Sequence, residues 1–309
     1  MNIIFLGTPE FSVRILDAIF NSDNKIVAVV TQIDKINGRK NKIEFSPVKK
    51  YAIEHNLKLF QFENISSDGF DILSNLKPDL MITAAYGQLI KQNILDICPI
   101  FNVHTSLLPK LRGASPVQTA LINGDTETGV TIMKTELKMD AGDIILQEKI
   151  NIERNIDAGT LLLELSNVAS RLILKAINSY ADGSIKYTKQ NEEEATFCKY
   201  INKSDSFIDF NCDGKSIYNK VRGMNPNPGT YFLLENLRIK VLKCEFIQSD
   251  ETIINRVEYA DKINGFCIGC KDGYIKLINI KPEGKNEMSG FQYLSGNKKI
   301  TQGILINEL

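Results

Sequence analysis

Three polar side chains in the first half of the chain have the types and spacing needed for acyl transfer. Asn102 and His104 alternate with apolar residues in the run FNVH, which starts at Phe101 and has the pattern of a short strand. Side chains two positions apart on a strand point to the same side, so these two should share a face. Asp140 follows later, beside Gly142, in a predicted turn.

Together, these groups suit transfer of an acyl group to an amine. Asn102 can donate a hydrogen bond to a carbonyl oxygen that gains negative charge. His104 can do the same or carry a proton, and Asp140 can orient or charge the imidazole or accept a proton through water. An unprotonated amine is already nucleophilic, so no Ser or Cys nucleophile is needed. A purely structural interpretation remains open, with Asn102 ending a strand, His104 buried and satisfied, and Asp140 serving a turn.

The residues around this triplet resemble the signature of the folate-dependent formyltransferases. The signature is carried by Asn102-Val103-His104, then Ser106-Leu107-Leu108-Pro109, then Met139-Asp140-Ala141-Gly142-Asp143. The resemblance implies that Asn102, His104 and Asp140 are catalytic. It also implies that the tetrahydrofolate donor is contacted by Ser106, Leu107, Leu108 and Pro109. Thr105 stands where close relatives often have Gly, and Thr does not share the positive φ open to Gly.

Two further stretches resemble one branch of that family, the methionyl-tRNA formyltransferases. One is the N-terminal run GTPEF that starts at Gly7. The other is Ala85-Tyr86-Gly87, similar to the segment that lines the pterin pocket, which implies folate contacts from Tyr86 and Gly87. For Tyr86, simple packing between a strand and a helix is an equally good interpretation. The turn after the first strand lacks G-x-G-x-x-G, which disfavours a nicotinamide or flavin cofactor.

A polar stretch from Gln32 to Pro47 is predicted to be one long loop. Loops of this length are often functional, and basic side chains in them can contact phosphates. A solvated loop whose lysines keep the chain soluble is the simpler alternative. Gly38-Arg39 ahead of Ser46-Pro47 resembles the insertion that methionyl-tRNA formyltransferases place against the tRNA acceptor end. The resemblance implies tRNA contacts from Arg39, Lys40 and Lys42.

Alternation of apolar strands with helices up to Tyr180 predicts an α/β domain, Rossmann-like, with a parallel-rich sheet. Ser115 is expected to cap the helix that starts at Pro116. Strands are expected at 2–6, 25–31, 57–60, 80–85, 101–104, 131–133 and 144–146, and helices from Pro9 and at 47–55, 67–76, 116–123 and 157–180.

Composition shifts at Gly183, and a second domain is expected beyond it. The predicted division is 1–185 for the catalytic domain, 186–204 for a linker and 205–309 for a C-terminal tRNA-binding domain. A helix at 214–221 and short strands at 238–246, 265–270 and 273–280 predict a small barrel, which the resemblance implies is of the OB type. Its tRNA contacts are expected from Lys203 and Arg222, on a face shared with Lys199, Lys215 and Lys220.

The overall composition sets further bounds. A chain of 309 residues can form two domains, and its formal net charge of zero gives no global signal for polyanion binding. The six cysteines are scattered, and we expect them to be reduced. Cys267 and Cys270 form C-x-x-C, but the only histidines, His55 and His104, lie far from it, so no metal is expected. No export signal or membrane-length apolar stretch is visible, and we expect a cytoplasmic monomer.

The resemblance thus implies transfer of a formyl group from 10-formyltetrahydrofolate to the amine of methionine on initiator methionyl-tRNA, a step of translation initiation. The alternative keeps this donor and changes the acceptor to the amine of a sugar nucleotide. The basic stretch around Arg39 and the GTPEF start favour tRNA. A non-catalytic RNA-binding protein would leave Asn102, His104 and Asp140 without a role.

Overall fold

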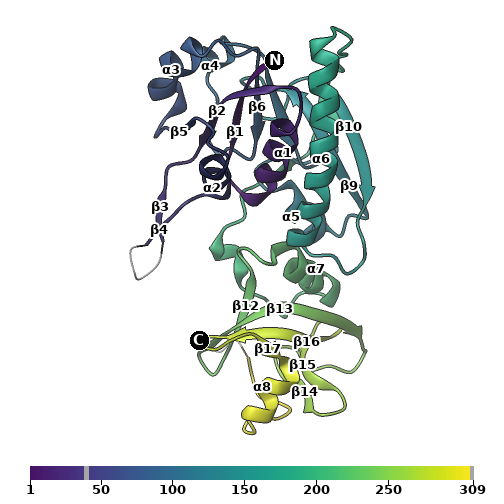
Figure 1. The fold of residues 1–309 in the computed structure, drawn as a ribbon. Helices are drawn as coiled ribbons and strands as arrows, with labels where there is room; N and C mark the ends of the chain where they lie inside the picture. Colours follow the sequence, from purple (N-terminus) through teal and green to yellow (C-terminus); the bar gives the residue numbers. More distant parts are fainter. Residues whose placement is uncertain (38–41, 307–309) are drawn as a thin grey trace. The chain divides into compact units, whose positions relative to one another are not determined.

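The computed structural model describes residues 1–37 and 42–306 (Figure 1). The chain forms two compact units, which are interleaved in sequence. Unit 1 comprises Met1–Gly113, Glu127–Asn151 and Leu162–Cys198, and unit 2 comprises Ala114–Thr126, Ile152–Leu161 and Lys199–Leu309.

Unit 1 is built on a seven-stranded sheet with the order β10-β9-β7-β6-β1-β2-β5. The five strands from β7 to β5 are parallel, and β9 and β10 form an antiparallel edge. This confirms the predicted α/β class with a parallel-rich sheet. The strands are β1 (Asn2–Gly7), β2 (Lys25–Thr31), β5 (Leu59–Gln61), β6 (Leu80–Ala84), β7 (Ile100–His104), β9 (Glu127–Lys134) and β10 (Ile144–Asn151).

The order of strands creates a switch point between β1 and β6. From β1 the chain moves outward through β2 to β5, and then it returns to the other side of β1 through β6 and β7. Ligands in open α/β sheets bind at the carboxyl ends of the strands near such a point. Asn102 and His104 lie on β7, with His104 as its last residue, so this edge of the sheet positions the predicted chemistry.

Helices cover the sheet because its strands are apolar on both faces, as in β6, whose five residues are all buried. Phe101 of β7 packs edge-on against Tyr180 of the long helix, with ring centroids 5.5 Å apart. The helices of unit 1 are α1 (Glu10–Phe20), α2 (Pro47–Glu54), α3 (Phe70–Asn75), α4 (Gln92–Leu95) and most of α6 (Ala158–Ala181), with a π-helical turn η1 (Ile65–Gly69) before α3 and a 3-10 turn η2 (Glu192–Glu194).

The prediction of one loop over 32–47 was wrong, because the stretch contains a hairpin. Strands β3 (Lys35–Asn37) and β4 (Lys42–Glu44) pair antiparallel, with Ile36 opposite Ile43. Single β-branched residues among charged ones give too short an alternation to be recognised. Beside the hairpin, Lys49 Nζ donates to Asp34 Oδ2 at 2.5 Å and to Gln61 Oε1 at 2.8 Å. These bonds tie the start of the hairpin to α2 and β5.

The segment predicted as a linker packs against unit 1 over part of its length. Ile144 and Thr188 form a β-bridge, and β11 (Phe197–Cys198) pairs in parallel with β8 (Arg112–Gly113). The division at 185 and 204 stays a prediction. A chain cut at 185 would lose these contacts, whereas a cut after Cys198 would keep them.

Unit 2 contains a six-stranded antiparallel sheet in the order β12-β13-β16-β15-β14, with β17 paired to β16. The antiparallel C-terminal domain is therefore confirmed, while its OB type stays a prediction. Its elements are α5 (Pro116–Asn123), η3 (Lys203–Ser206), α7 (Gly214–Met224), β12 (Thr230–Leu234), β13 (Leu237–Gln248), β14 (Val257–Asp261), β15 (Gly265–Cys270), β16 (Gly273–Pro282), β17 (Met288–Ser289) and α8 (Gly290–Gly296).

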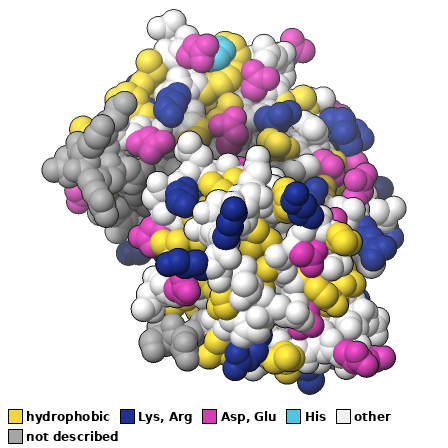
Figure 2. Space-filling model, turned by 90° about the horizontal axis from the view of Figure 1, so that it is seen from below, with side chains coloured by type: hydrophobic (Ala, Val, Ile, Leu, Met, Phe, Trp, Pro, Cys, Tyr) yellow, Lys and Arg dark blue, Asp and Glu magenta, His cyan; other side chains and the backbone are white. Residues whose placement is uncertain are grey.

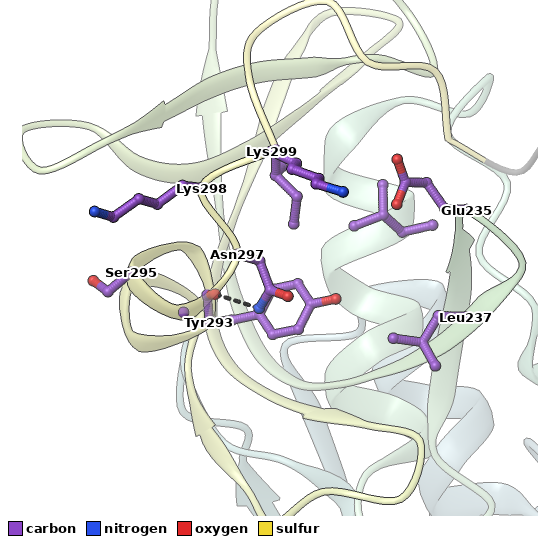
Figure 3. Close-up of a pocket in the computed structure, with 10 residues that line it drawn as sticks. Glu235, Leu237, Tyr293, Ser295, Asn297, Lys298 and Lys299 are labelled. Carbon is purple, nitrogen blue, oxygen red and sulfur yellow. Dashed lines mark hydrogen bonds between the residues drawn. The ribbon is translucent and has the colours of Figure 1, made fainter.

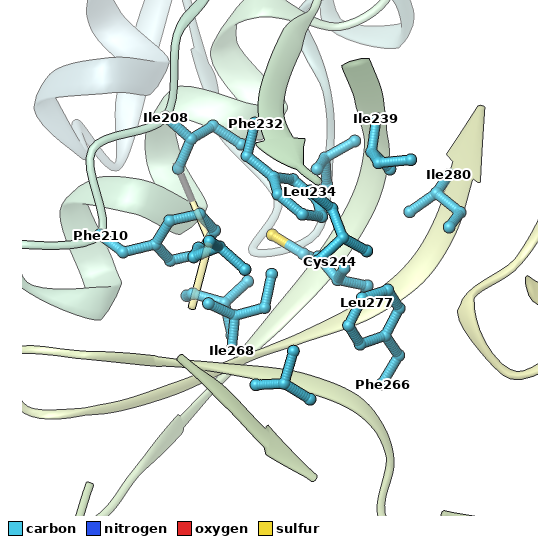
Figure 4. Close-up of a cluster of buried hydrophobic side chains, with 14 of the residues drawn as sticks. Ile208, Phe210, Phe232, Leu234, Ile239, Cys244, Phe266, Ile268, Leu277 and Ile280 are labelled. Atoms are coloured by element: carbon cyan, nitrogen blue, oxygen red, sulfur yellow. The ribbon is translucent and has the colours of Figure 1, made fainter. Parts of the chain in front are cut away.

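An apolar cluster forms the core of unit 2 in the described residues (Figure 4). Phe232 lies at its centre, edge-on to Phe210 at 5.8 Å and to Phe266 at 6.4 Å between ring centroids. Burying a side chain of this size contributes about 2 kcal/mol or more relative to leaving it exposed. Helix α7 caps the cluster with Ile217 and Val221.

The helix α5 packs against α7, far along the chain. A Cβ built on Gly223 would lie 2.7 Å from Ile122, so the absence of a side chain there permits the close approach. Ser115 is the N-cap residue of α5, as predicted, but its side chain makes no capping hydrogen bond. Its hydroxyl accepts a hydrogen bond from Ile201 N at 3.3 Å. The helix ends at Gly124, which has the left-handed φ of 77° typical of a glycine C-cap.

No helix within the described ranges is long and apolar enough to cross a membrane. On the face shown in Figure 2, Lys and Arg side chains lie among acidic, apolar and uncharged ones, and those coloured there form no continuous basic stripe. This agrees with the zero formal net charge.

Candidate active site

Strand β7 sets the direction of Asn102 and His104. It runs parallel to β6, with Asn102 opposite Thr83, and antiparallel to β9, with His104 opposite Thr131. Both side chains leave the same face of the strand because they are two positions apart. The opposite face carries Phe101, which packs on α6. The candidate site residues and the packing residue Phe101 therefore lie on opposite faces of β7, as its alternating sequence predicted.

The orientation of the Asn102 amide is fixed from the neighbouring strand. Thr83 Oγ1 donates a hydrogen bond to Asn102 Oδ1 at 2.7 Å, and Thr83 itself is buried. Because the amide oxygen is used as an acceptor, Nδ2 is left on the other side of the amide as a donor. Asn102 is half-buried, so this donor remains near the surface of the sheet edge. The arrangement suits donation to an oxygen that acquires charge.

The protonation of His104 follows from its partner. The ring is 6% exposed, and Nε2 lies 2.9 Å from the carbonyl oxygen of Leu111. A carbonyl oxygen can only accept, so Nε2 carries the proton. In the neutral ring the lone pair is then on Nδ1, which lies 3.8 Å from Asp140 Oδ1. His104 can therefore accept a proton on Nδ1, and the resulting imidazolium would form an ion pair with Asp140.

Asp140 is held in its turn by more than its contact with His104. Its Oδ2 accepts a hydrogen bond from Gly113 N at 2.8 Å. Its backbone has φ 51°, in the left-handed region that residues other than Gly, Asn and Asp seldom adopt. The structure brings His104 and Asp140 together and places Asn102 on the same face of β7 as His104. The assignment of all three as catalytic stays a prediction.

The loop predicted to contact the donor is held by hydrogen bonds from side chains to its backbone. Ser106 Oγ donates to Lys110 O at 2.6 Å, which closes the loop on itself. Thr131 Oγ1 donates to Ser106 O at 2.7 Å and accepts from Leu108 N at 3.2 Å. Gln147 Nε2 donates to Leu108 O at 3.0 Å and to Thr131 Oγ1 at 2.8 Å. Ser106 and Leu108 are buried, whereas Leu107 and Pro109 are partly exposed and open to a ligand.

The aromatic ring of Tyr86 lies in the core of unit 1. It is 4% exposed and packs in the apolar cluster that includes Leu6 and Met81. Burial raises the pKa of its hydroxyl. Its carbonyl oxygen accepts from Thr8 Oγ1 at 2.9 Å and from Gln32 Nε2 at 3.1 Å. The packing interpretation thus accounts for the ring. Gly87 is exposed with φ 91°, and folate contact by either residue stays a prediction.

The predicted tRNA contacts fall in both units. Arg39 and Lys40 lie outside the described residues, as does the side chain of Lys42 in β4. Lys203 is exposed in η3. Arg222 is half-buried on α7, donates to Asn219 Oδ1 at 2.9 Å, and burial lowers its pKa. These contacts give Arg222 a packing role beside its predicted one.

The other lysines of the predicted basic face also differ in their exposure to solvent. Lys199 and Lys215 are exposed. Lys220 turns inward, where its Nζ donates to Phe207 O at 2.7 Å and burial lowers its pKa. Unit 2 thus offers Lys199, Lys203 and Lys215 to solvent.

A pocket of about 560 Å³ opens in unit 2 between the β12–β13 turn and α8 (Figure 3). Tyr293, Glu235 and Lys299 line it, and Asn297 Nδ2 donates to Tyr293 O at 2.7 Å. None of the predicted site residues lies in it.

The buried cysteines of unit 2 are inert in character. Burial raises the pKa of the Cys267 thiol to about 12 and that of Cys270 to about 11. Both are free of disulfides. Within the described ranges, no group of three or more His, Cys, Asp or Glu residues is arranged to hold a metal ion.

Comparison with known proteins decides the family. A family model described as formyl transferase matches residues 1–177, and a second described as formyl transferase, C-terminal domain, matches residues 200–298. The chain belongs to the formyltransferase family. The fold class and the enzymatic character predicted from the sequence are thereby confirmed.

Full-length relatives of this formyltransferase are named methionyl-tRNA formyltransferase. That of Lactobacillus acidophilus is 40% identical over 299 residues, covering 96% of this chain and 95% of its own. That of Fusobacterium nucleatum is 37% identical over 302 residues, covering 96% and 97%. Among solved structures, a sugar 3N-formyl transferase with dTDP and 5-N-formyl-THF has a TM-score of 0.67 at 22% identity, covering 93% of this chain and 99% of that one. This last likeness concerns the fold alone.

Several residues that shape the site gave no signal in the sequence. Thr83 orients Asn102 from a position 19 residues away, and Gln147 holds Leu108 from 39 residues away. Thr83 reads as part of a buried strand, and Gln147 as an ordinary polar residue of an edge strand. Their roles depend on which strands become neighbours, so only the sheet order reveals them.

Proposed function

We propose that this formyltransferase moves a formyl group from 10-formyltetrahydrofolate to the amine of methionine on initiator methionyl-tRNA. The observation that carries the choice of acceptor is the likeness over nearly the whole chain to relatives named methionyl-tRNA formyltransferase. Three of them are 36 to 40% identical and cover 96 to 98% of this chain. The product is formylmethionyl-tRNA, the charged tRNA used for translation initiation.

The geometry of unit 1 supports a direct attack by the amine on the formyl carbon. The donor, when bound, supplies the formyl carbonyl group. Asn102 Nδ2 donates a hydrogen bond to the oxygen of that group as negative charge develops, which is worth about 100-fold or more in rate. His104 Nδ1 takes up the proton that the amine loses. The bond between the formyl carbon and N10 of the donor then breaks, and tetrahydrofolate leaves with a proton on N10. Asp140 stabilises the imidazolium from 3.8 Å.

We assign His104 to the proton rather than to the oxyanion. Its Nε2–H is engaged with Leu111 O at 2.9 Å, so the neutral ring has no second N–H to offer to an oxygen. Donation to the oxyanion would require a charged ring. Asn102 is therefore the principal oxyanion donor in this proposal, and His104 acts as general base.

The donor's pterin and benzoyl parts fit a site made of backbone and apolar edges. Leu107 and Pro109 present apolar surface, and the backbone of their loop is immobilised by Thr131 and Gln147. A preformed loop lowers the ordering cost of binding. At the exposed Gly87 a Cβ would make ordinary van der Waals contact with Gln32, at 3.7 Å.

The decisive experiment is a test of the acceptor. Purified protein is incubated with a labelled formyl donor and either charged initiator methionyl-tRNA or a dTDP-linked amino sugar. We expect label on the tRNA-bound methionine and none on the sugar nucleotide. Label on the amino sugar alone would overturn the proposed acceptor and support the sugar-nucleotide alternative.

Variants of the three site residues test the chemistry itself. His104→Ala, Asp140→Asn and Asn102→Ala should each lower kcat by about 100-fold or more, because each acts on charge that develops in the reaction. The donor's dissociation constant, measured by fluorescence titration, should change little. Near-normal turnover in any one of them would remove that residue from the catalytic set.

Arg39→Ala tests the tRNA insertion. We propose that it raises KM for charged tRNA by about fivefold or more, as expected for loss of an Arg contact to nucleic acid, and leaves donor KM unchanged. Lys50→Ala is the matched control, because Lys50 is an exposed basic residue of the adjacent helix α2. Equal effects of both substitutions would reduce the role of Arg39 to general charge.

A further inference from the structure

Arg112 is a buried cation that the proposed chemistry does not use. Its side chain is 1% exposed and donates four hydrogen bonds. Its Nε and Nη2 donate to Gln190 Oε1 at 3.0 and 2.8 Å. Its Nη1 and Nη2 donate to the carboxylate of Glu192 at 3.2 and 2.8 Å. Removing a charged side chain from water costs free energy. The hydrogen-bond partners of Arg112 indicate what this buried charge does.

Gln190 connects Arg112 to the turn that carries Asp140. Its Nε2 donates to Asp140 O at 2.9 Å and to Gly142 O at 2.7 Å. Arginine has no acceptor, so the Gln190 oxygen must face it and the Gln190 nitrogen must face the two carbonyls. Arg112 therefore fixes the orientation of the Gln190 amide, and that amide holds both sides of Ala141. Asp140 keeps its left-handed backbone, with φ 51°, inside this clamp.

The neighbours of Arg112 in sequence hold the catalytic side chains directly. Leu111 O accepts from His104 Nε2 at 2.9 Å, and Gly113 N donates to Asp140 Oδ2 at 2.8 Å. The segment 111–113 thus contacts the imidazole, the carboxylate and, through the Arg112 side chain and Gln190, the backbone of Asp140. The contacts form a closed ring, in which a shift of the Asp140 turn would change its distance from His104.

We propose that Arg112 and Gln190 are positioning residues for the pair His104 and Asp140. They hold the Asp140 carboxylate 3.8 Å from His104 Nδ1, where it stabilises the ring once a proton has arrived. The inference rests on the proposed function, since it needs His104 and Asp140 to be catalytic. The competing interpretation is a structural clip that fastens the segment around Gln190 and Glu192 to unit 1 and has no effect on the reaction.

The substitution Gln190→Glu separates these two interpretations. It keeps the size of the side chain and gives Arg112 a carboxylate partner, so a structural clip would be as strong as before or stronger. It also replaces the Nε2 donor by an oxygen that faces two carbonyl oxygens, which frees the Asp140 turn. A displacement of about 1 Å in a catalytic group can cost about 100-fold in rate.

We expect Gln190→Glu to lower kcat by about 10- to 100-fold, with KM for donor and tRNA within about twofold of the parent. Its thermal midpoint should stay close to that of the parent, because the stronger pair with Arg112 offsets the loss of two hydrogen bonds to carbonyl oxygens. Arg171→Met is the matched control, because it removes another Arg–carboxylate pair of unit 1, that of Arg171 with Glu148 at 2.7 Å. Its kcat should be unchanged.

A double-mutant cycle gives a measurement that differs between the positioning role and a purely structural role. In an Asp140→Asn background there is no carboxylate to position, so Gln190→Glu should cost little further rate. A structural role would give the same cost in both backgrounds. The imidazole nitrogen resonances of His104 should shift in Gln190→Glu, whereas those of His55, the only other histidine of the chain, should not.

The results separate the positioning role of Gln190 from the proposed catalytic role of Asp140. A normal kcat in Gln190→Glu, beside an inactive Asp140→Asn, overturns the positioning role alone. Additive losses in the cycle, or a raised donor KM with normal kcat, overturn it as well. A fully active Asp140→Asn would instead overturn the catalytic assignment on which the inference rests.

Discussion

Thr83 offers a graded test of how Asn102, the proposed oxyanion donor, is held. Its hydroxyl donates to Asn102 Oδ1 at 2.7 Å from the adjacent strand, and this bond selects the amide orientation that leaves Nδ2 free. Thr83→Val keeps the shape of the side chain and removes the donor. Asn102 would then retain its amide but lose the constraint on it. We expect a loss of rate that is smaller than in Asn102→Ala.

The magnitude follows from one hydrogen bond. A buried hydrogen bond of this kind contributes about 0.5 to 1.5 kcal/mol net. If the reaction must supply that energy to orient the amide, kcat falls by about 2- to 13-fold, because 1.36 kcal/mol corresponds to about tenfold in rate. Asn102→Ala removes the donor itself and should cost about 100-fold or more. The two substitutions should therefore differ by about one order of magnitude.

The assay is steady-state formylation at saturating donor and tRNA, with Thr83→Ser as the control. Serine keeps the hydroxyl and loses only a methyl group, so its kcat should stay within about twofold of the parent. A Thr83→Val enzyme with the parent kcat would refute the orienting role. Equal losses in the Val and Ser variants would also refute it, because packing rather than the hydrogen bond would then be responsible.

Three other predictions follow from the contacts of unit 1 and from the thiols. Gln147→Leu should raise donor KM by about fivefold with little change in kcat, because one hydrogen bond to Leu108 O is lost; a fall in kcat alone at saturating donor would contradict this. Hydrogen bonds from Arg112 and then Lys138 lower the pKa of Glu192 from its ordinary 4.5 to about 2. The stability that this carboxylate adds is thus fully present above about pH 4.5 and is lost as the pH falls to about 2. The difference in thermal midpoint between the parent and Glu192→Gln should accordingly close over that range, and a difference that did not vary with pH would contradict the ion pair. With iodoacetamide at pH 7, the exposed Cys212 should react fast. Buried thiols such as Cys244, whose pKa is raised to about 12, should not react fast. Rapid modification of Cys267 or Cys270 in the native protein, mapped by peptide mass, would contradict this.

Local pattern was sufficient for most of the fold. The strands β2 and β15 were predicted at the bounds they have, because each is an unbroken apolar run between turn residues. The strands β12 and β14 and the helix α8 were missed. Helix α8 has glycine at both ends, and a capping box between Ser289 and Gln292 stabilises its start. A cap can be recognised only once the helix is suspected, so poor intrinsic propensity concealed it.

The site was predictable where its residues lie close in sequence. Asn102 and His104 are two apart on one strand, and their shared face follows from the strand period alone. The contacts that orient the site come from elsewhere in the chain. Gln190 reaches the Asp140 turn from 50 residues away, out of a stretch whose charge and polarity predicted a linker. Pairing of this kind depends on tertiary structure, which no local pattern encodes.

The interleaving of the two units has a consequence for synthesis of the chain. Helix α5 packs on α7, which follows about ninety residues later. At about 5 to 20 residues per second, a ribosome needs about 5 to 18 s to deliver that partner. During this interval the side of α5 at Ile122, which Gly223 of α7 approaches, lacks this native partner. The contact between α5 and α7 can therefore form only after the C-terminal part of unit 2 has emerged.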